Sequence, residues 1–156
     1  MKTIEDWLSL YGRDHQNPVN KMIHWVCVPV IMYTVLGLFW CIPVPWRDNT
    51  PWLNVCTLYY TFALLFYLRL SLSLFVGFLL VGGAMLLLNW KLYDVLGATM
   101  YTAVLVGLFV VAWIFQFVGH KIEGQKPSFF EDMQFLLIGP AWILSFIYKK
   151  LGINYK

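Results

Sequence analysis

Charged side chains are scarce in this chain of 156 residues: Asp, Glu, Lys and Arg make up 12% of it, while hydrophobic residues make up 60%. A typical soluble domain is about a quarter charged and about half apolar. The shortage of charge therefore excludes an ordinary water-soluble fold. The few basic residues are scattered and form no stripe, so the chain also lacks the electrostatic footprint of a nucleic-acid-binding protein.

Cysteine is also sparse, and its spacing excludes a structural zinc site. Cys27, Cys41 and Cys56 form no CxxC pair, and we expect them to be small apolar residues inside helices. No nucleotide-binding motif is present. The first residues carry several charges and do not form the apolar core of a cleavable signal peptide. We therefore expect the first apolar helix to direct insertion.

Long runs without charge are what the chain does have. They cover residues 22–46, 52–68, 70–90 and 95–119. One bilayer crossing needs about 20 apolar residues, so the second run is short but acceptable. Lys91 and Asp94 mark the expected turn between the third and fourth runs. The pattern predicts an all-α, multi-pass transmembrane bundle with four crossing helices, forming a single membrane-embedded domain over residues 1–156.

Two further segments flank these runs. Apolar residues recur at helical spacing near the start, at Ile4, Trp7, Leu8 and Tyr11. This spacing predicts a short N-terminal interfacial helix, with a frayed polar terminus as the alternative. A fifth apolar stretch, residues 133–148, is interrupted by Gly139-Pro140. It is either a re-entrant or interfacial hairpin-like segment or a short, broken crossing, and the sequence leaves both open.

Lysine and arginine counts predict the orientation, because cytoplasmic loops carry more of them. One side of the membrane would carry Lys2, Arg13, Lys21, Arg69, Lys121 and Lys126. The opposite side would carry only Arg47 and Lys91. We therefore place the first side in the cytoplasm, at a bacterial inner membrane or, in a eukaryote, at the endoplasmic reticulum.

The three histidines of the chain all stand at the ends of apolar runs. His15 and His24 lie at the entrance of the first run, and His120 lies at the exit of the fourth. Four crossings return a chain to the side on which it started, so the pattern places all three imidazoles on one side at similar depth. Three neutral imidazoles with a nearby carboxylate suit Fe(II) or Zn(II).

Polar residues accompany the first two histidines. Asn17-Pro18 is a helix start, and Asn20 and His24 are four residues apart, so they share a helix face. Asp14 could orient a ring nitrogen of His15. The alternative is that these residues are interfacial polar groups and that Asp14 is a solvated charge.

A second polar group surrounds the last histidine. Gln116, His120 and Glu123 form one stripe if the helix continues past Gly119. An amide so far inside an apolar run needs a partner, which would be a metal-bound water, a substrate carboxylate or another helix. Glu123 could ligate metal, act as a base or pair with Lys126 at the surface.

These residues resemble the signature of the 2-hydroxy fatty acid dioxygenase family. Tyr11, His15, Asn20, His24 and Pro29 carry the resemblance, together with the segment 116–123 and Pro127, and Ser128 departs from it. The resemblance implies a membrane enzyme dependent on Fe(2+). Its reaction is α-oxidation, in which a 2-hydroxy fatty acid and O2 give the fatty acid one carbon shorter, CO2 and water. The substrate supplies the four electrons that O2 takes, so no external reductant is needed.

The resemblance makes His15, His24 and His120 the essential histidines, and we expect them to hold the metal. Glu123 is the candidate base or fourth ligand, while Gln116 and Asn20 would orient the substrate or the imidazoles. The substrate's anionic headgroup would be attracted by Arg13, Lys21 and Lys121.

Two other functions compete with this one. A non-catalytic integral membrane protein could use its histidines to bind haem or a partner. A zinc-dependent membrane hydrolase could use the same three ligands. The sequence does not determine the oligomeric state or the preferred length of the acyl chain.

Overall fold

The computed structural model describes residues 2–46, 50–126 and 134–155. Among these residues all regular secondary structure is helical, as the apolar runs predicted. The helices are α1 (Ile4–Arg13), α2 (Pro18–Cys41), α3 (Val55–Leu70), α4 (Leu72–Glu123) and α5 (Phe135–Leu151). The expected loop residues Arg47, Pro127 and Ser128 lie outside the described residues, as does Met133, the first residue of the fifth apolar stretch.

Local signals start the helices where the sequence placed them. The Asn17 side chain caps α2 by accepting a hydrogen bond from the Val19 N–H at 2.9 Å, and Pro18 occupies the first turn. Helix α1 starts at Thr3, whose hydroxyl accepts from the Asp6 N–H while the Asp6 carboxylate accepts from the Thr3 N–H. The predicted apolar face of α1 is buried and packs against α5.

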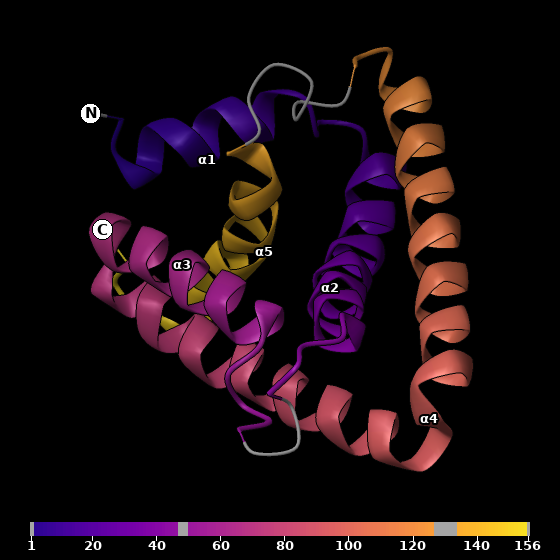
Figure 1. Ribbon diagram of the computed structural model, residues 1–156. Helices are drawn as coiled ribbons and strands as arrows, with labels where there is room; N and C mark the ends of the chain where they lie inside the picture. The colour runs from indigo at the N-terminus through magenta and orange to yellow at the C-terminus, as the bar shows by residue number, and fades with distance from the viewer. Residues whose placement is uncertain (1, 47–49, 127–133, 156) are drawn as a thin grey trace.

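The third and fourth apolar runs belong to one element, α4, which bends sharply (Figure 1). The bend lies at Gly97, with φ 73° and ψ 161°, a conformation that is essentially restricted to glycine. The prediction of a turn at Lys91 and Asp94 was therefore wrong. Both residues are helical, and the chain turns three residues after Asp94, at Gly97. The two arms of α4 are residues 72–96 and 98–123.

Helix α5 is continuous through Gly139 and Pro140, so the prediction of a break or hairpin there was wrong, while its re-entrant, interfacial or crossing position stays a prediction. Proline removes one backbone hydrogen bond and displaces the preceding carbonyls. Tyr67 of α3 donates its hydroxyl hydrogen to the Leu137 carbonyl at 2.7 Å, which satisfies an acceptor in that weakened turn. Tertiary contact therefore compensates for the break that the local sequence favours.

Two of the described helices, α2 and α4, are long and apolar enough to cross a membrane, and α3 is a shorter apolar helix. Only 33% of the most apolar window of α2 and 22% of that of α4 are buried inside the protein. Core helices of a soluble protein would be mostly buried, because large exposed apolar surfaces are rare in such proteins. The 52 residues of α4 greatly exceed the length of one crossing.

The second arm of α4 runs alongside α2 (Figure 1). Hydrogen bonds between largely buried side chains tie α2 to both arms of α4 near the bend. The Tyr101 hydroxyl donates to Asn89 Oδ1 at 2.6 Å, so the Tyr33 hydroxyl donates to Tyr101, also at 2.6 Å. At the opposite end, α1 packs on α5 and ends beside the start of α2 (Figure 1). The three histidines, Asn20 and Glu123 all lie at this end of the bundle, where α4 also ends.

Candidate metal centre

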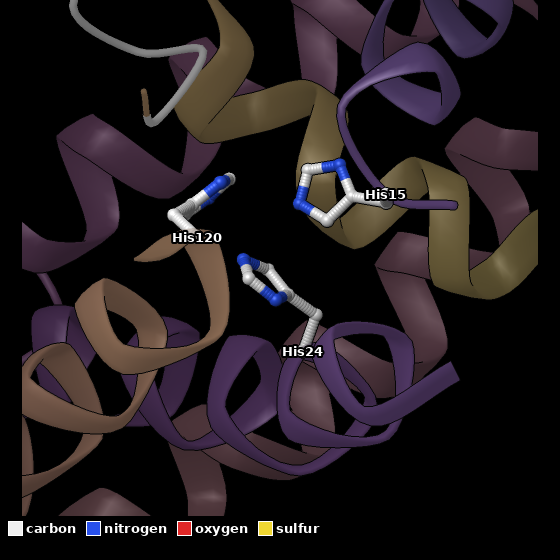
Figure 2. A group of neighbouring side chains, drawn as sticks. All are labelled: His15, His24 and His120. Atoms are coloured by element: carbon white, nitrogen blue, oxygen red, sulfur yellow. The ribbon is translucent and has the colours of Figure 1, made fainter. Parts of the chain in front are cut away.

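Three imidazoles from distant parts of the chain meet at this end of the bundle. His15 lies between α1 and α2, His24 lies near the start of α2, and His120 lies in the last turn of α4. One ring nitrogen of each lies within 4.8 Å of the other two. The rings face a common centre in Figure 2. The structure thus brings together the three histidines that the sequence, with its four apolar runs, placed on one side of the membrane.

Backbone carbonyls orient two of the rings. The Nδ1 atom of His15 lies 2.7 Å from the Tyr11 carbonyl, and the Nδ1 atom of His24 lies 3.0 Å from the Asn20 carbonyl. A carbonyl only accepts, so each Nδ1 must carry the hydrogen and donate it. Each Nε2 is then left with a lone pair. Fixing the tautomer in this way is the usual outer support of a metal-binding histidine.

One nitrogen of each ring has no hydrogen-bond partner among the described residues. Nε2 of His15, Nε2 of His24 and Nδ1 of His120 are buried and unpartnered in the part of the chain that the structure describes. A buried polar atom without a partner costs about 1–3 kcal/mol. Three such atoms facing one centre fit a metal ion, since ligand atoms about 2.1 Å from a metal lie about 3 Å from each other. A small inward movement of the three rings would bring their nitrogens to metal-binding distance.

His15, which lies outside the long apolar helices, is in the protonation state that metal binding requires. Burial lowers the pKa of its imidazole, and the opposing effects of the Tyr11 carbonyl and the Asp14 carboxylate do not reverse that shift. The ring is therefore neutral near pH 7. Neutral imidazole is the form that binds a metal.

Glu123 joins the end of α4 to the start of α2. Its Oε1 accepts hydrogen bonds from the backbone N–H groups of Gln16 at 2.8 Å and Asn17 at 3.0 Å. Its Oε2 accepts from the Asn17 N–H at 2.8 Å and from Nδ2 of Asn20 at 3.0 Å. We call Glu123 with these three residues the Glu123 clasp. It holds the segment between His15 and His24 against the helix that carries His120.

The Glu123 clasp depends on a close approach of α2 and α4. Gly119 faces Asn20, and a Cβ atom at position 119 would collide with the Asn20 amide oxygen. Helix α4 continues past Gly119 to Glu123, so Gln116, His120 and Glu123 do form the predicted stripe. The Glu123 carboxylate bonds to Gln16, Asn17 and Asn20 instead of forming the predicted surface pair with Lys126.

Two aromatic residues complete the surroundings of His15: Tyr11, which the family signature contains but to which no role was assigned, and Trp142, which was not predicted. The Tyr11 ring stacks on His15 with centroids 4.2 Å apart, and the Trp142 ring of α5 lies 5.3 Å from His15. Tyr11 could have been found, because it precedes His15 by one helical turn. Trp142 carries no signal in a single sequence, since it reaches the site only through the packing of α5 on α1.

An apolar cavity of about 410 Å³ adjoins the histidine cluster. His24, His120 and Gln116 contribute to its lining, and most of the remaining wall is aliphatic or aromatic. Gln116 is buried and lies one turn before His120. Its amide therefore lines the cavity beside the cluster, where it could bind the polar group of an otherwise apolar ligand.

Comparison with known proteins connects this geometry to a reaction. The model of the Mpo1-like family, described as 2-hydroxy-palmitic acid dioxygenase Mpo1-like, matches residues 1–151. The chain belongs to the Mpo1-like family. This confirms the family that the histidine signature indicated.

This chain is also similar to the 2-hydroxy-palmitic acid dioxygenase MPO1 of Saccharomyces cerevisiae. It is 31% identical over 147 residues, which cover 93% of this chain and 79% of the relative. No solved structure matches. Membership of the Mpo1-like family supports dioxygenase activity on a 2-hydroxy fatty acid and leaves the metal and the site residues to be argued from the geometry.

The predicted headgroup-binding residues stand around the site and not in it. Arg13 ends α1, Lys21 lies in the first turn of α2, and Lys121 follows His120. The described lining of the cavity contains none of the three. The Arg13 side chain is 62% exposed and pairs with Asp14 at 3.0 Å. The Asp14 carboxylate therefore faces Arg13, while the His15 Nδ1 is held by the Tyr11 carbonyl.

Proposed function

We propose that the protein is an Fe(2+)-dependent dioxygenase that converts a 2-hydroxy fatty acid and O2 into the fatty acid one carbon shorter, CO2 and water. One observation carries the proposal: three buried, unpartnered imidazole nitrogens converge at the polar end of an apolar cavity. Three neutral imidazoles leave open positions on iron, as a reaction with O2 and a chelating substrate requires. Membership of the Mpo1-like family supports the same substrate class and reaction.

In this proposal His15, His24 and His120 hold the iron. The bound metal would supply the redox chemistry that couples O2 to oxidation of the substrate's 2-carbon. The Tyr11 and Asn20 carbonyls keep two of the ring nitrogens correctly oriented. Burial of the rings excludes bulk water from the reacting atoms.

Other residues would position the substrate. Gln116 would hydrogen-bond the carboxylate or the 2-hydroxyl, because its amide lines the cavity beside the histidines. Arg13, Lys21 and Lys121 would attract the anionic headgroup to the membrane surface, an effect of about 1 kcal/mol for each charge. In the proposed site Asn20 and Glu123 orient the imidazoles through the Glu123 clasp. The prediction that Glu123 takes the hydroxyl proton stays a prediction, which is tested in the Discussion.

The proposal places the site at a membrane surface. Helix α2, helix α3 and the two arms of α4 would supply four crossings, and residues 1–156 would form one membrane-embedded domain. The excess of basic residues on the side of the histidines supports a cytoplasmic site. A substrate dissolved in the bilayer could then enter the cavity without leaving the lipid.

The decisive experiment measures metal content, O2 consumption and CO2 release with the protein purified in detergent. We expect about one iron per chain and equal amounts of O2 consumed and CO2 released without added reductant. Metal removal by a chelator should abolish turnover, and Fe(2+) should restore it. His15→Ala, His24→Ala and His120→Ala should each lose iron and activity. Full activity in any one of these variants would remove that residue from the proposed site.

The same preparation separates the competing functions. A zinc hydrolase would carry zinc and would work under argon, whereas the proposed reaction stops without O2. A haem protein would show a Soret absorption band, which three imidazoles around non-haem iron do not give. Either result would overturn the proposal.

A further inference from the structure

The apolar cavity follows α2 for most of that helix. Val28, Met32, Val35 and Phe39 line it at spacings of three or four residues, so they form one stripe on the helix face. A stripe of this kind needs a neighbour to bury it, and here it faces open space as well as other helices. The cavity is therefore elongated along the helix and not confined to the surroundings of the histidines.

The opposite wall shows the same elongation. In the second arm of α4, the lining residues His120, Gln116, Trp113 and Phe109 also recur at spacings of three or four. The stripe is polar where it begins, at His120 and Gln116, and aromatic further away. Because α2 and this arm run side by side in opposite directions, His24 and His120 share one end of the cavity. The cavity has one polar end and a long apolar body.

Two aromatic rings stand at the far end. Phe39 is the last residue of α2 in the lining, and Tyr59 is the first residue of α3 in it. Their ring centroids lie 5.0 Å apart in an edge-to-face contact. Such pairs are stabilising and hold a defined geometry. The two rings therefore form a stop between α2 and α3 at the end opposite the histidines.

We propose that this cavity holds the acyl chain of the substrate, with the carboxylate and the 2-hydroxyl at the histidines, and that Phe39 and Tyr59 limit the chain length. The inference rests on the proposed function. The helix rises about 22 Å between His24 and Phe39, which is comparable to the length of an extended long-chain acyl group. Shorter chains would leave part of the apolar wall uncovered, and longer chains would meet the two rings.

Turnover of a homologous series of 2-hydroxy fatty acids tests the stop. The readout is the ratio of kcat/KM for acids longer than the wild-type optimum to that for the optimum, because a general loss of folded protein cancels in the ratio. Phe39→Ala should raise it by about tenfold or more, as methylene groups in apolar pockets commonly change selectivity by that factor. Tyr59→Ala is the second variant and should act in the same direction.

The matched control is Phe62→Ala on α3. Phe62 is 64% exposed and lies outside the described lining, so the same deletion of a ring should leave the ratio unchanged. An unchanged ratio in both Phe39→Ala and Tyr59→Ala would overturn the proposed stop. A ratio raised equally by Phe62→Ala would overturn it too, because the effect would then not belong to the cavity.

A labelling experiment locates the chain independently of turnover. A 2-hydroxy acid with a diazirine at its terminal carbon is bound to the wild-type protein in lipid nanodiscs under argon and then irradiated. The expected label lies on peptides that contain Phe39 or Tyr59 and is displaced by unlabelled acid. Label confined to lipid-facing positions such as Phe62 would overturn the inference, even if turnover is normal. Label at the two rings without aerobic turnover would support the acyl site and refute the proposed reaction.

Discussion

At the scale of single residues, backbone carbonyls orient two of the three histidines. The Tyr11 and Asn20 carbonyls take the Nδ1 hydrogens of His15 and His24, so both Nε2 lone pairs face the shared centre. Both carbonyls precede their histidine by four residues. The orientation is therefore local in origin, while the meeting with His120 depends on the whole bundle.

The Glu123 clasp gives a prediction at this scale. Glu123→Gln should keep the side-chain shape but turn one acceptor into a donor that faces the N–H groups of Gln16, Asn17 or Asn20. The segment between His15 and His24 should loosen as a result. We expect the affinity for iron to fall by about 10–100-fold, as is typical for residues that support metal ligands. Titration of the metal-free protein with Fe(2+) measures the change.

Glu5→Gln is the control for this experiment, since it removes the same charge from the exposed side of α1. Two results would contradict the prediction. Unchanged iron affinity with lost turnover would favour the catalytic base that the sequence suggested. Complete loss of iron would favour a direct ligand.

The sequence predicted the site residues whose side-chain type is rare in this chain and missed those whose type is common. His15, His24 and His120 were identified because histidine is rare here and marks the ends of apolar runs. Their convergence followed from an even number of runs. The sequence did not show that the Glu123 oxygens are used by backbone N–H groups, because those donors have no residue-specific signal. Phe39 was missed for a related reason, since one more aromatic residue in an apolar run does not stand out.

At the scale of helices, Gly97 turns α4 back on itself. Asn17-Pro18 was predicted correctly because a cap acts through neighbouring residues. Gly97 was not, since a glycine inside an apolar run carries no information about its φ angle, and the charges at Lys91 and Asp94 placed the turn a few residues too early. At Pro140 the error was the opposite: a break was predicted where the helix is continuous. The local effect of proline is compensated there by a hydrogen bond from Tyr67.

The bend gives a prediction with an internal control. Gly97→Ala should destabilise the protein by about 1–3 kcal/mol, because a Cβ atom strains this backbone conformation although no neighbouring atom obstructs it. Gly107→Ala, in the second arm of α4 and also without close neighbours, should stabilise by about 0.5–1 kcal/mol. Thermal unfolding in detergent should therefore shift in opposite directions. Equal shifts in the two variants would show that the bend does not require glycine.

At the scale of the whole molecule, the two arms of α4 decide the topology. If both arms cross the bilayer, the bend and the linker between α2 and α3 lie on the side opposite the histidines. The described structure fits this arrangement, because α1, the start of α2 and the end of α4 lie together (Figure 1). Hydropathy predicted the number of apolar runs but not how tightly they associate, since tight association depends on contacts such as that of Gly119 with Asn20.

Labelling of single cysteines tests the topology. The native cysteines are first replaced by serine, and exposed positions then receive one cysteine each: Ser9, Thr50, Asp94 or Gln125. A membrane-impermeant thiol reagent should reach Ser9→Cys and Gln125→Cys from the cytoplasmic side. It should reach Thr50→Cys and Asp94→Cys only from the other side. Labelling of Asp94→Cys and Gln125→Cys from the same side would refute a double crossing by α4.

The distance along the chain between His24 and His120 has a consequence for biosynthesis. A ribosome delivers the first two imidazoles long before the third, and Glu123 follows later still. With the proposed iron site, a nascent or truncated chain would lack one of the three ligands, so metal loading would be one of the final steps of maturation. Unfinished copies would then be unable to begin oxygen chemistry.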